Sequence, residues 1–251
     1  MNPYETDKLV HEYLLFHYGR PEEVMPWQSG PLDAVDYPVR CVTECVDAAR
    51  LPAGARALDV GCAVGRSSFE LARFCQEVIG VDYSERFIEA AQVLAAQGSA
   101  AYSRVEEGML ASDAVAKVPE GVDRSRVRFQ HGDAHALSSD LGVFDVVLAA
   151  NLIDRLEKPR QFLTQLPRLV KPGGQLIITS PYTWLLDYTP IDEWIGGMAV
   201  EGREQRTLDG LSAALAGDFE LIGTKDLPFL IREHARKFQW SVAQASLWRR
   251  H

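Results

Sequence analysis

Short apolar runs alternate with longer amphipathic segments from residue 55 onward. The apolar runs predict strands at residues 55–61, 77–83, 127–133, 144–150 and 174–180. Helical periodicity predicts helices between them at residues 66–75, 84–97 and 159–170. Strands that are apolar along their whole length and separated by helices are typical of a parallel sheet covered on both faces. With right-handed crossovers, this pattern predicts a doubly wound, Rossmann-like α/β fold.

Residues with special backbone preferences predict where these helices begin and end. Ser67 and Ser68 are expected to mark the start of the first helix, and Ser84 is expected to cap the second. The run from Pro172 to Gly174 is expected to stop the third helix. Two further strands are predicted at residues 219–231 and 238–250.

Three segments lie outside the alternation of strands and helices. Residues 1–54 have helical patterning and are expected to form an N-terminal cap, which leaves residues 55–251 as the α/β domain. One insertion near residues 98–126 lengthens the second crossover. Another near residues 181–207 is rich in aromatic residues and glycine and follows the fifth strand.

Composition and charge narrow the classes of partner. Aspartate and glutamate number 35 against 26 lysines and arginines, which gives a formal net charge of −9 and disfavours a nucleic-acid partner. The sequence lacks an apolar run of membrane-spanning length and a signal peptide, so no membrane partner is expected. The four cysteines form no C-x-x-C pair, which is typical of free thiols in a reducing cytoplasm. His131 and His135 lack a third ligand, so no metal site is predicted.

Acidic residues end three successive predicted strands. Asp59 begins a D-x-G-x-[GA]-x-G pattern with glycines at 61 and 65, where Gly61 permits a positive φ and Gly65 lets a ligand approach the backbone. Asp82 follows about 20 residues later, where a carboxylate grips ribose hydroxyls. Asp133 ends the next strand, within reach of an adenine amino group. The combination predicts nucleoside binding, and the alternative is that Asp59 and Asp82 only cap strand ends.

The charge of the first motif indicates which nucleoside binds. An acidic Asp59 before the first glycine repels phosphate and attracts an ammonium group, unlike the dinucleotide fingerprint G-x-G-x-x-G. Residues 55 to 250 therefore resemble the class I S-adenosylmethionine-dependent methyltransferases, from which the sequence departs mildly by Ala63 in place of the middle glycine. The resemblance implies seven strands with the last one antiparallel, and S-adenosyl-L-methionine as cofactor. The residues that it assigns to the cofactor are Asp59, Gly61, Cys62, Gly65, Arg66, Asp82, Tyr83, Asp133, Ala134 and Asn151.

Flanking segments carry a second, closer resemblance. They are "NPYETDKLVHEYLLFHYG", "YPVRC", "NLIDRL", "SPYTWL" and "REHARKFQW". Together they resemble the ovothiol-pathway methyltransferase that forms the C-terminal domain of 5-histidylcysteine sulfoxide synthases. That family methylates N1 of 4-mercaptohistidine, also named 5-thiohistidine, to give ovothiol A. The sequence has no sulfoxide synthase part, so the resemblance implies cooperation with a separate synthase.

Two other functions stay open at this stage. The first is a class I methyltransferase that acts on another small amine, phenol or quinone. The second is a cofactor-binding module without catalysis.

Topology selects candidates for the acceptor site, because ligands lie outside the carboxyl ends of the strands. Asn151 and Asp154 follow the fourth strand and are expected to contact the acceptor or the cofactor ammonium. Asp154 is also the candidate for fixing the imidazole tautomer. The turn after the sixth strand is expected at the same edge, where Arg232 suits a substrate carboxylate. Arg155 is interpreted as a solvated helix residue, His17 as packing, and Trp184 as either site wall or packing. The full set of predicted substrate residues is Tyr4, Tyr18, Tyr37, Arg40, Tyr182, Trp184, Arg232, Glu233 and His234.

Overall fold

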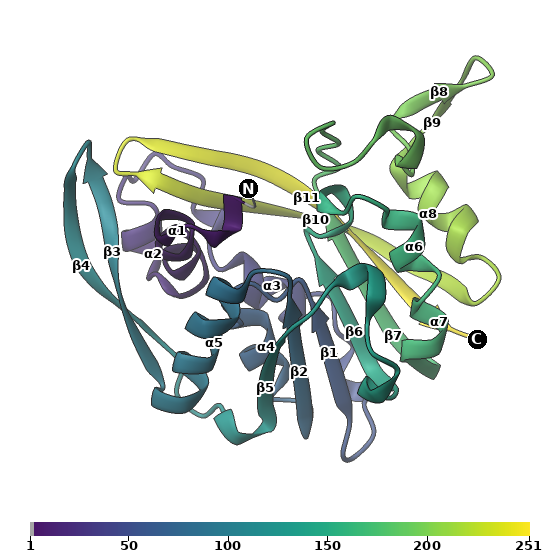
Figure 1. Ribbon diagram of the computed structural model, residues 1–251, viewed down its shortest axis with the longest axis horizontal. Helices are drawn as coiled ribbons and strands as arrows, with labels where there is room; N and C mark the ends of the chain where they lie inside the picture. The colour runs from purple at the N-terminus through teal and green to yellow at the C-terminus, as the bar shows by residue number, and fades with distance from the viewer. Residues whose placement is uncertain (1–2) are drawn as a thin grey trace.

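Seven strands form one mixed sheet in the computed structural model, which describes residues 3–251 (Figure 1). Their order is β10-β11-β7-β6-β1-β2-β5. β1, β2, β5, β6 and β7 run parallel, while β11 is antiparallel to both β7 and β10. The predicted fold class is confirmed. The sheet strands are β1 (Arg56–Val60), β2 (Glu77–Asp82), β5 (Val127–His131), β6 (Phe144–Ala150), β7 (Val170–Ser180), β10 (Phe219–His234) and β11 (Lys237–Arg250).

Helices cover both faces of the sheet. One face packs against α1 (Asp7–Tyr18), α3 (Tyr37–Thr43), α4 (Arg66–Leu71) and α5 (Glu85–Gln97) in one hydrophobic cluster. The other face packs against α6 (Pro159–Leu163), α7 (Leu166–Leu169) and α8 (Thr207–Leu215) in a second cluster. A short helix α2 (Pro21–Val24) follows α1. Because both faces are covered, the central strands are apolar along nearly their whole length.

The predicted strands and most predicted helices are present, with two corrections. The helix expected at residues 159–170 is divided into α6 and α7, because Pro167 offers no backbone N–H to continue α6. β7 then begins at Val170, so Pro172 lies in the irregular start of a strand and does not end a helix. Gly65 precedes α4 as its N-cap, which places both predicted capping serines inside that helix. Ser84 caps α5 as predicted, since its Oγ accepts a hydrogen bond from the Phe87 N–H at 3.1 Å.

Both insertions contain small hairpins. The first forms β3 (Ser99–Glu107) and β4 (Leu110–Lys117), and the second contains β8 (Met198–Val200) and β9 (Arg203–Gln205). In Figure 1 the two hairpins project from opposite ends of the molecule. Neither hairpin joins the seven-stranded sheet.

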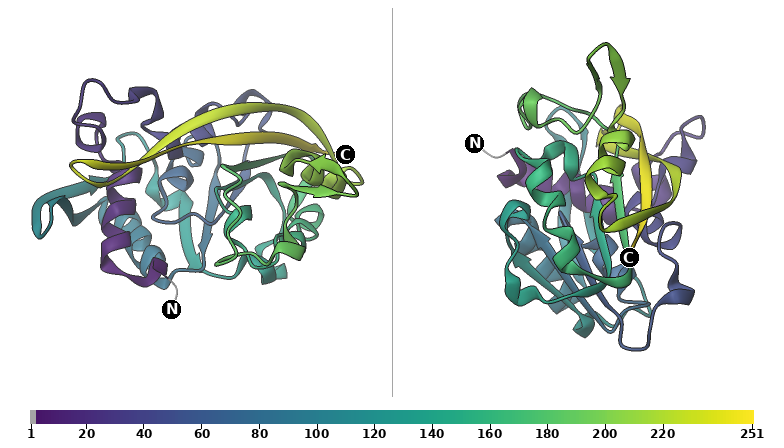
Figure 2. Two further views of the ribbon diagram at one scale, coloured as in Figure 1. Left: turned by 90° about the horizontal axis from the view of Figure 1, so that it is seen from above. Right: turned by 90° about the vertical axis from the view of Figure 1, so that its right-hand side faces the viewer.

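The β10–β11 hairpin is the longest element and arches across the molecule (Figure 2). β11 pairs with β7 only as far as Ser180, which lies opposite Gln244. Beyond that point the two hairpin strands continue together toward β3, where β10, β3 and α1 contact one another (Figure 1). This overshoot decides where the turn after β10 is placed.

The cap is helical, as its sequence pattern predicts. Its first two residues lie outside the described part of the chain, and the division into a cap and an α/β domain stays a prediction. Within residues 3–251, no helix is long and apolar enough to cross a membrane.

Candidate active site

The loop after β1 is wound by three residues with positive φ. Gly61, Ala63 and Gly65 have φ values of 75°, 46° and 85°. A Cβ on Gly65 would lie 2.4 Å from Cζ of Phe129, so this glycine makes room for a β5 side chain. The expected close approach of a ligand to the Gly65 backbone stays a prediction. Cys62 is buried in the same loop, and burial raises the pKa of its thiol well above the ordinary value.

Asp59 lies at the floor of this loop with 1% of its surface exposed. Its Oδ2 accepts a hydrogen bond from the Ser68 Oγ at 2.6 Å. Burial raises the pKa of Asp59 to about 7; Ser68 opposes that shift and the nearby Asp82 adds to it. A buried carboxylate whose charge is this poorly compensated gains strongly from a cationic ligand.

Asp82 ends β2 and caps two backbone N–H groups. Its Oδ2 accepts from Ala63 at 2.8 Å, and its Oδ1 accepts from Ser84 at 2.9 Å. Burial raises the pKa of Asp82 to about 6. Asp82 therefore caps the end of its strand, which was the alternative to ribose binding. It leaves room for ribose binding, because an ionised carboxylate has about four lone-pair sites.

The end of β5 carries the predicted adenine side of the site. Asp133 Oδ1 accepts hydrogen bonds from the backbone N–H of His135 at 2.8 Å and from its ring Nδ1 at 2.7 Å. The side chain of Asp133 remains 45% exposed, and Ala134 beside it is buried. Tyr83 is 61% exposed, and its ring lies 5.8 Å from that of His131. These residues lie at the carboxyl edge of the sheet, next to the end of β2.

A buried hydrogen-bond cluster joins the cap to the ends of β6 and β7. The Tyr37 hydroxyl donates to Asn151 Oδ1 at 2.7 Å and lies 2.6 Å from the Thr179 Oγ1. Asn151 has a positive φ of 51°, and its backbone N–H donates to the Thr179 carbonyl at 2.8 Å. The strained backbone therefore aims the Asn151 amide at the same edge as Asp59.

Asp154 has a different environment from the one predicted. The residue has no exposed surface, and its Oδ2 accepts from the Thr183 N–H at 3.0 Å and from Arg155 Nη1 at 3.1 Å. Burial raises the pKa of Asp154, and Arg155 counteracts that effect. Such a carboxylate cannot touch an acceptor without a rearrangement. Its visible role is to position Arg155 and the segment after β7.

The two aromatic residues after β7 lie in different surroundings. Tyr182 has φ 55° and donates from its hydroxyl to Gln244 Oε1 at 3.0 Å. Trp184 is buried, stacks on Trp194 with ring centroids 6.1 Å apart, and donates from Nε1 to Thr207 Oγ1. The packing interpretation of Trp184 therefore describes its contacts better than the site-wall interpretation.

The cap contacts the carboxyl edge of the sheet at two places, one on each side of α1. At its carboxyl end, the Tyr18 hydroxyl donates to the Val64 carbonyl at 2.8 Å. Before its amino end, the Tyr4 carbonyl accepts from the Ser84 Oγ at 2.9 Å. His17 is half-buried, and loss of solvent around its ring lowers its pKa to about 3, so it is a neutral imidazole. The Tyr4 ring packs against Tyr13 and Phe87, and contact of Tyr4 or Tyr18 with a substrate stays a prediction.

Two predicted arginines make contacts within the protein framework. Arg40 binds the Asp33 and Pro228 carbonyls through Nη1 and Glu44 through Nε, which ties α3 to β10. Arg66 is buried and pairs with Glu70 one turn along α4 at 2.9 Å. Arg40 therefore does not form part of the cleft, contrary to the prediction.

The turn after β10 is also placed differently from the prediction. Arg232 lies six residues past the end of the β7 pairing, about 20 Å along an extended strand. Its guanidinium binds the Glu23 carbonyl and the Glu106 carboxylate of β3. Glu233 pairs with Lys237, and the His234 Nδ1 accepts from the Arg236 N–H. The direction of β10 was predicted correctly, but its length carries the turn away from the cleft.

Three residues of the site were missed in the sequence. Ser68 contacts Asp59, Thr179 joins Tyr37 to Asn151, and Tyr188 packs under Arg155, whose guanidinium lies 4.9 Å from its ring centre. Thr179 had a signal, because it is a polar residue near the carboxyl end of a buried strand. Arg155, interpreted as solvated, is only 27% exposed.

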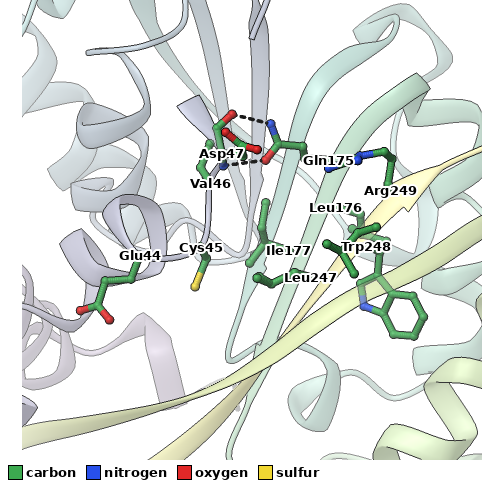
Figure 3. Close-up of a pocket in the computed structure, with 11 residues that line it drawn as sticks. Glu44, Cys45, Val46, Asp47, Gln175, Leu176, Ile177, Leu247, Trp248 and Arg249 are labelled. Atoms are coloured by element: carbon green, nitrogen blue, oxygen red, sulfur yellow. Dashed lines mark hydrogen bonds between the residues drawn. The ribbon is translucent and has the colours of Figure 1, made fainter. Parts of the chain in front are cut away.

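A surface cavity of about 280 Å³ lies elsewhere (Figure 3). It is lined by the segment after α3, the middle of β7 and the carboxyl end of β11, and Gln175 bridges both backbone groups of Asp47 there. Gln175 lies five residues before the end of β7, so this cavity is separate from the cleft at the carboxyl edge.

The sequence of this chain is similar to sequences of known methyltransferases. Residues 58–178 match a family model described as "Methyltransferase domain". A ubiquinone biosynthesis O-methyltransferase from Maricaulis maris is 33% identical over 51% of this chain, and the match spans 41% of that relative.

Solved structures share the fold at low sequence identity. A methyltransferase from Methanosarcina mazei is 18% identical with a TM-score of 0.51, over 79% of this chain and 93% of its own. An N-methyltransferase from Bradyrhizobium japonicum is 15% identical with a TM-score of 0.50, and the match covers 78% of this chain and 85% of that protein. Residues 58–178, just under half of the chain, are therefore similar to a methyltransferase domain, which supports S-adenosylmethionine as the cofactor. The solved structures show that the fold is shared.

Proposed function

We propose that this protein transfers the methyl group of S-adenosylmethionine to the side-chain-proximal ring nitrogen of 4-mercaptohistidine, which gives ovothiol A. The five flanking segments that resemble the ovothiol-pathway methyltransferase support this assignment, since they span nearly the whole chain. The observation that carries the proposal is the buried cluster of Tyr37, Asn151 and Thr179, which brings two of those segments together at the cleft.

The described residues fit the cofactor. The buried Asp59, with its pKa raised to about 7, suits the ammonium group of the methionine end, and Asp82 suits the ribose. The cofactor supplies a methyl group made electrophilic by its sulfonium. Asp133 and Ala134 would border the adenine. Arg66, which pairs with Glu70, would support the loop from beneath.

Chemically, the protein needs to hold an imidazole nitrogen in line with the methyl group. The nitrogen lone pair forms the new bond to carbon while the bond from carbon to sulfur breaks, and the other ring nitrogen then releases its proton to water. Positioning of the two reactants at about 3 Å accounts for most of the acceleration in such a displacement. Asn151 is the proposed positioning group, because its fixed backbone presents an amide at this edge.

A second candidate is methylation of a phenol or quinone precursor. The similarity to ubiquinone biosynthesis O-methyltransferases favours it, but it covers about half of this chain and two fifths of those relatives. The polar groups near the cleft, among them Tyr37, Tyr182 and Arg155, favour a small hydrophilic acceptor over a prenylated ring.

The deciding experiment is a competition among acceptors. The purified protein is incubated with labelled S-adenosylmethionine and equal concentrations of 5-thiohistidine, histidine, histamine and a catechol. Products are identified by mass spectrometry. Preferred methylation of 5-thiohistidine on the predicted nitrogen supports the proposal, whereas preferred methylation of histidine, histamine or the catechol would overturn it.

A further inference from the structure

Arg155 is held by contacts that leave part of its guanidinium directed away from the protein framework. It ends the short 3-10 helix Ile153–Arg155 that follows β6. Its Nη1 donates to the Asp154 carbonyl at 2.9 Å, the Asp154 Oδ2 at 3.1 Å and the Thr183 carbonyl at 3.0 Å. The guanidinium plane lies over Tyr188, and 27% of the side chain remains exposed. The framework therefore holds the guanidinium at Nη1, and the group also contacts the side chain of Tyr4.

The cap places Tyr4 against this cation. The Tyr4 phenol interacts with both Arg155 and Tyr188. The carbonyl of the same residue accepts from Ser84, which follows β2. β1 lies between β2 and β6 in the sheet, so Tyr4 spans the carboxyl end of β1. The guanidinium therefore lies at the carboxyl edge of the sheet, the edge at which the loop of residues 61–65 begins.

Arg155 is opposite in charge to the two carboxylates that are proposed to bind the cofactor. Asp59 and Asp82 form the floor, and both suit cationic or hydroxyl groups of the cofactor. Arg232, the arginine expected to hold a carboxylate, is engaged by Glu106 far along the hairpin. The Arg155 guanidinium with two phenols beside it supplies the planar donors that a carboxylate needs, since arginine pairs with carboxylates in a bidentate manner.

We propose that Arg155, flanked by Tyr4 and Tyr188, binds the carboxylate of the methyl acceptor and selects an amino acid over its decarboxylated amine. The inference rests on the proposed function and names the anchor that the function requires. Asp154 acts as a positioning residue, because its buried carboxylate fixes the Nη1 corner of Arg155. Tyr188, which accepts a hydrogen bond from Tyr4, is the phenol left to donate to the bound carboxylate.

The test compares two acceptors that differ only in the carboxylate: 5-thiohistidine and its decarboxylated amine. Dissociation constants are measured by calorimetry on the protein saturated with S-adenosylhomocysteine, and turnover is measured with S-adenosylmethionine. Arg155→Lys is the main variant, because it keeps a positive charge beside the buried Asp154 and loses the planar fork. Arg160→Gln is the matched control, since Arg160 binds the Trp194 carbonyl outside the cleft.

The wild-type protein is expected to bind the amino acid about 10- to 100-fold more tightly than the amine, the loss expected when a charge-assisted pair is removed. Arg155→Lys should reduce this preference at least fivefold and leave cofactor affinity unchanged, whereas Arg160→Gln should keep the full preference. If Arg155→Lys is poorly folded, the double variant Asp154→Asn/Arg155→Gln replaces it, because it leaves no uncompensated buried carboxylate.

Equal binding of the two acceptors by the wild type, or an undiminished preference in the variant, would overturn the anchor. The proposed function fails separately. Binding that discriminates between the acceptors without any methylation of 5-thiohistidine would refute the function and keep the anchor. Binding of neither acceptor would refute both.

Discussion

The buried Asp59 makes the stability of the cofactor-free protein depend on pH in a direction that can be calculated. Its carboxyl is 1% exposed, and burial raises its pKa to about 7, against about 3.9 in an unfolded chain. Between these two values the folded protein retains a proton that the unfolded chain has released. The free energy of unfolding therefore falls as pH rises from about 4 to about 7, by about 4 kcal/mol in total.

Replacing Asp59 with Asn removes this dependence and keeps the shape of the side chain. The amide oxygen still accepts the hydrogen bond from Ser68, and no charge is buried at high pH. Relative to the wild type, Asp59→Asn should gain about 3 kcal/mol of unfolding free energy between pH 5 and pH 8. That gain corresponds to a rise of roughly 6–12 °C in Tm for a protein of this size. The same change should abolish tight cofactor binding, since the ammonium loses its counter-charge.

Thermal unfolding of the cofactor-free wild type and variant at pH 5, 6, 7 and 8 measures the difference directly. Asp113→Asn, an exposed aspartate on β4, is the control and should show no gain with pH. A difference in Tm between wild type and Asp59→Asn that stays constant from pH 5 to pH 8 would refute the argument that burial raises this pKa.

Three further predictions concern the same cleft. Cofactor affinity in the wild type should weaken about tenfold from pH 8 to pH 6, because Asp59 takes up a proton below pH 7; calorimetry showing equal affinities would contradict this. Gly65→Ala should lower the unfolding free energy by about 2–4 kcal/mol in urea titration, since its Cβ meets Phe129 at a positive φ; a change below about 0.5 kcal/mol would contradict that overlap. Tyr37→Phe should cost about 1–3 kcal/mol, because Asn151 Oδ1 loses the shorter of its two hydrogen bonds and keeps only the one from Thr179 Oγ1 at 3.3 Å, and it should lower turnover. Unchanged stability and turnover would show that this cluster is dispensable.

Part of the site was predictable because its signals are local. The strand ends at Asp59, Asp82 and Asp133 follow from short apolar runs, and parallel strands place their carboxyl ends at one edge. The Ser84 cap likewise depends only on its own helix. These features need no knowledge of what packs around them.

Other predictions failed because they depended on distances set by packing. The direction of β10 follows from topology, but its length past β7 depends on pairing with β11 and on contacts with β3, so Arg232 was placed wrongly. Arg155 was misjudged for a related reason. Its partners Tyr4 and Tyr188 come from segments far away in the sequence.

The doubly wound fold, the three acidic strand ends and the kind of cofactor follow from the sequence alone, because each is encoded within a few neighbouring residues. Which other polar groups lie at the carboxyl edge of the sheet depends on tertiary packing. It buried Asp154, removed Arg232 and Arg40 from the cleft, and brought Tyr4 of the cap to Arg155. The positions of these side chains depend on the length of each strand or helix and on the segments that pack against it. Packing between segments far apart in the sequence determines both the length and the covering.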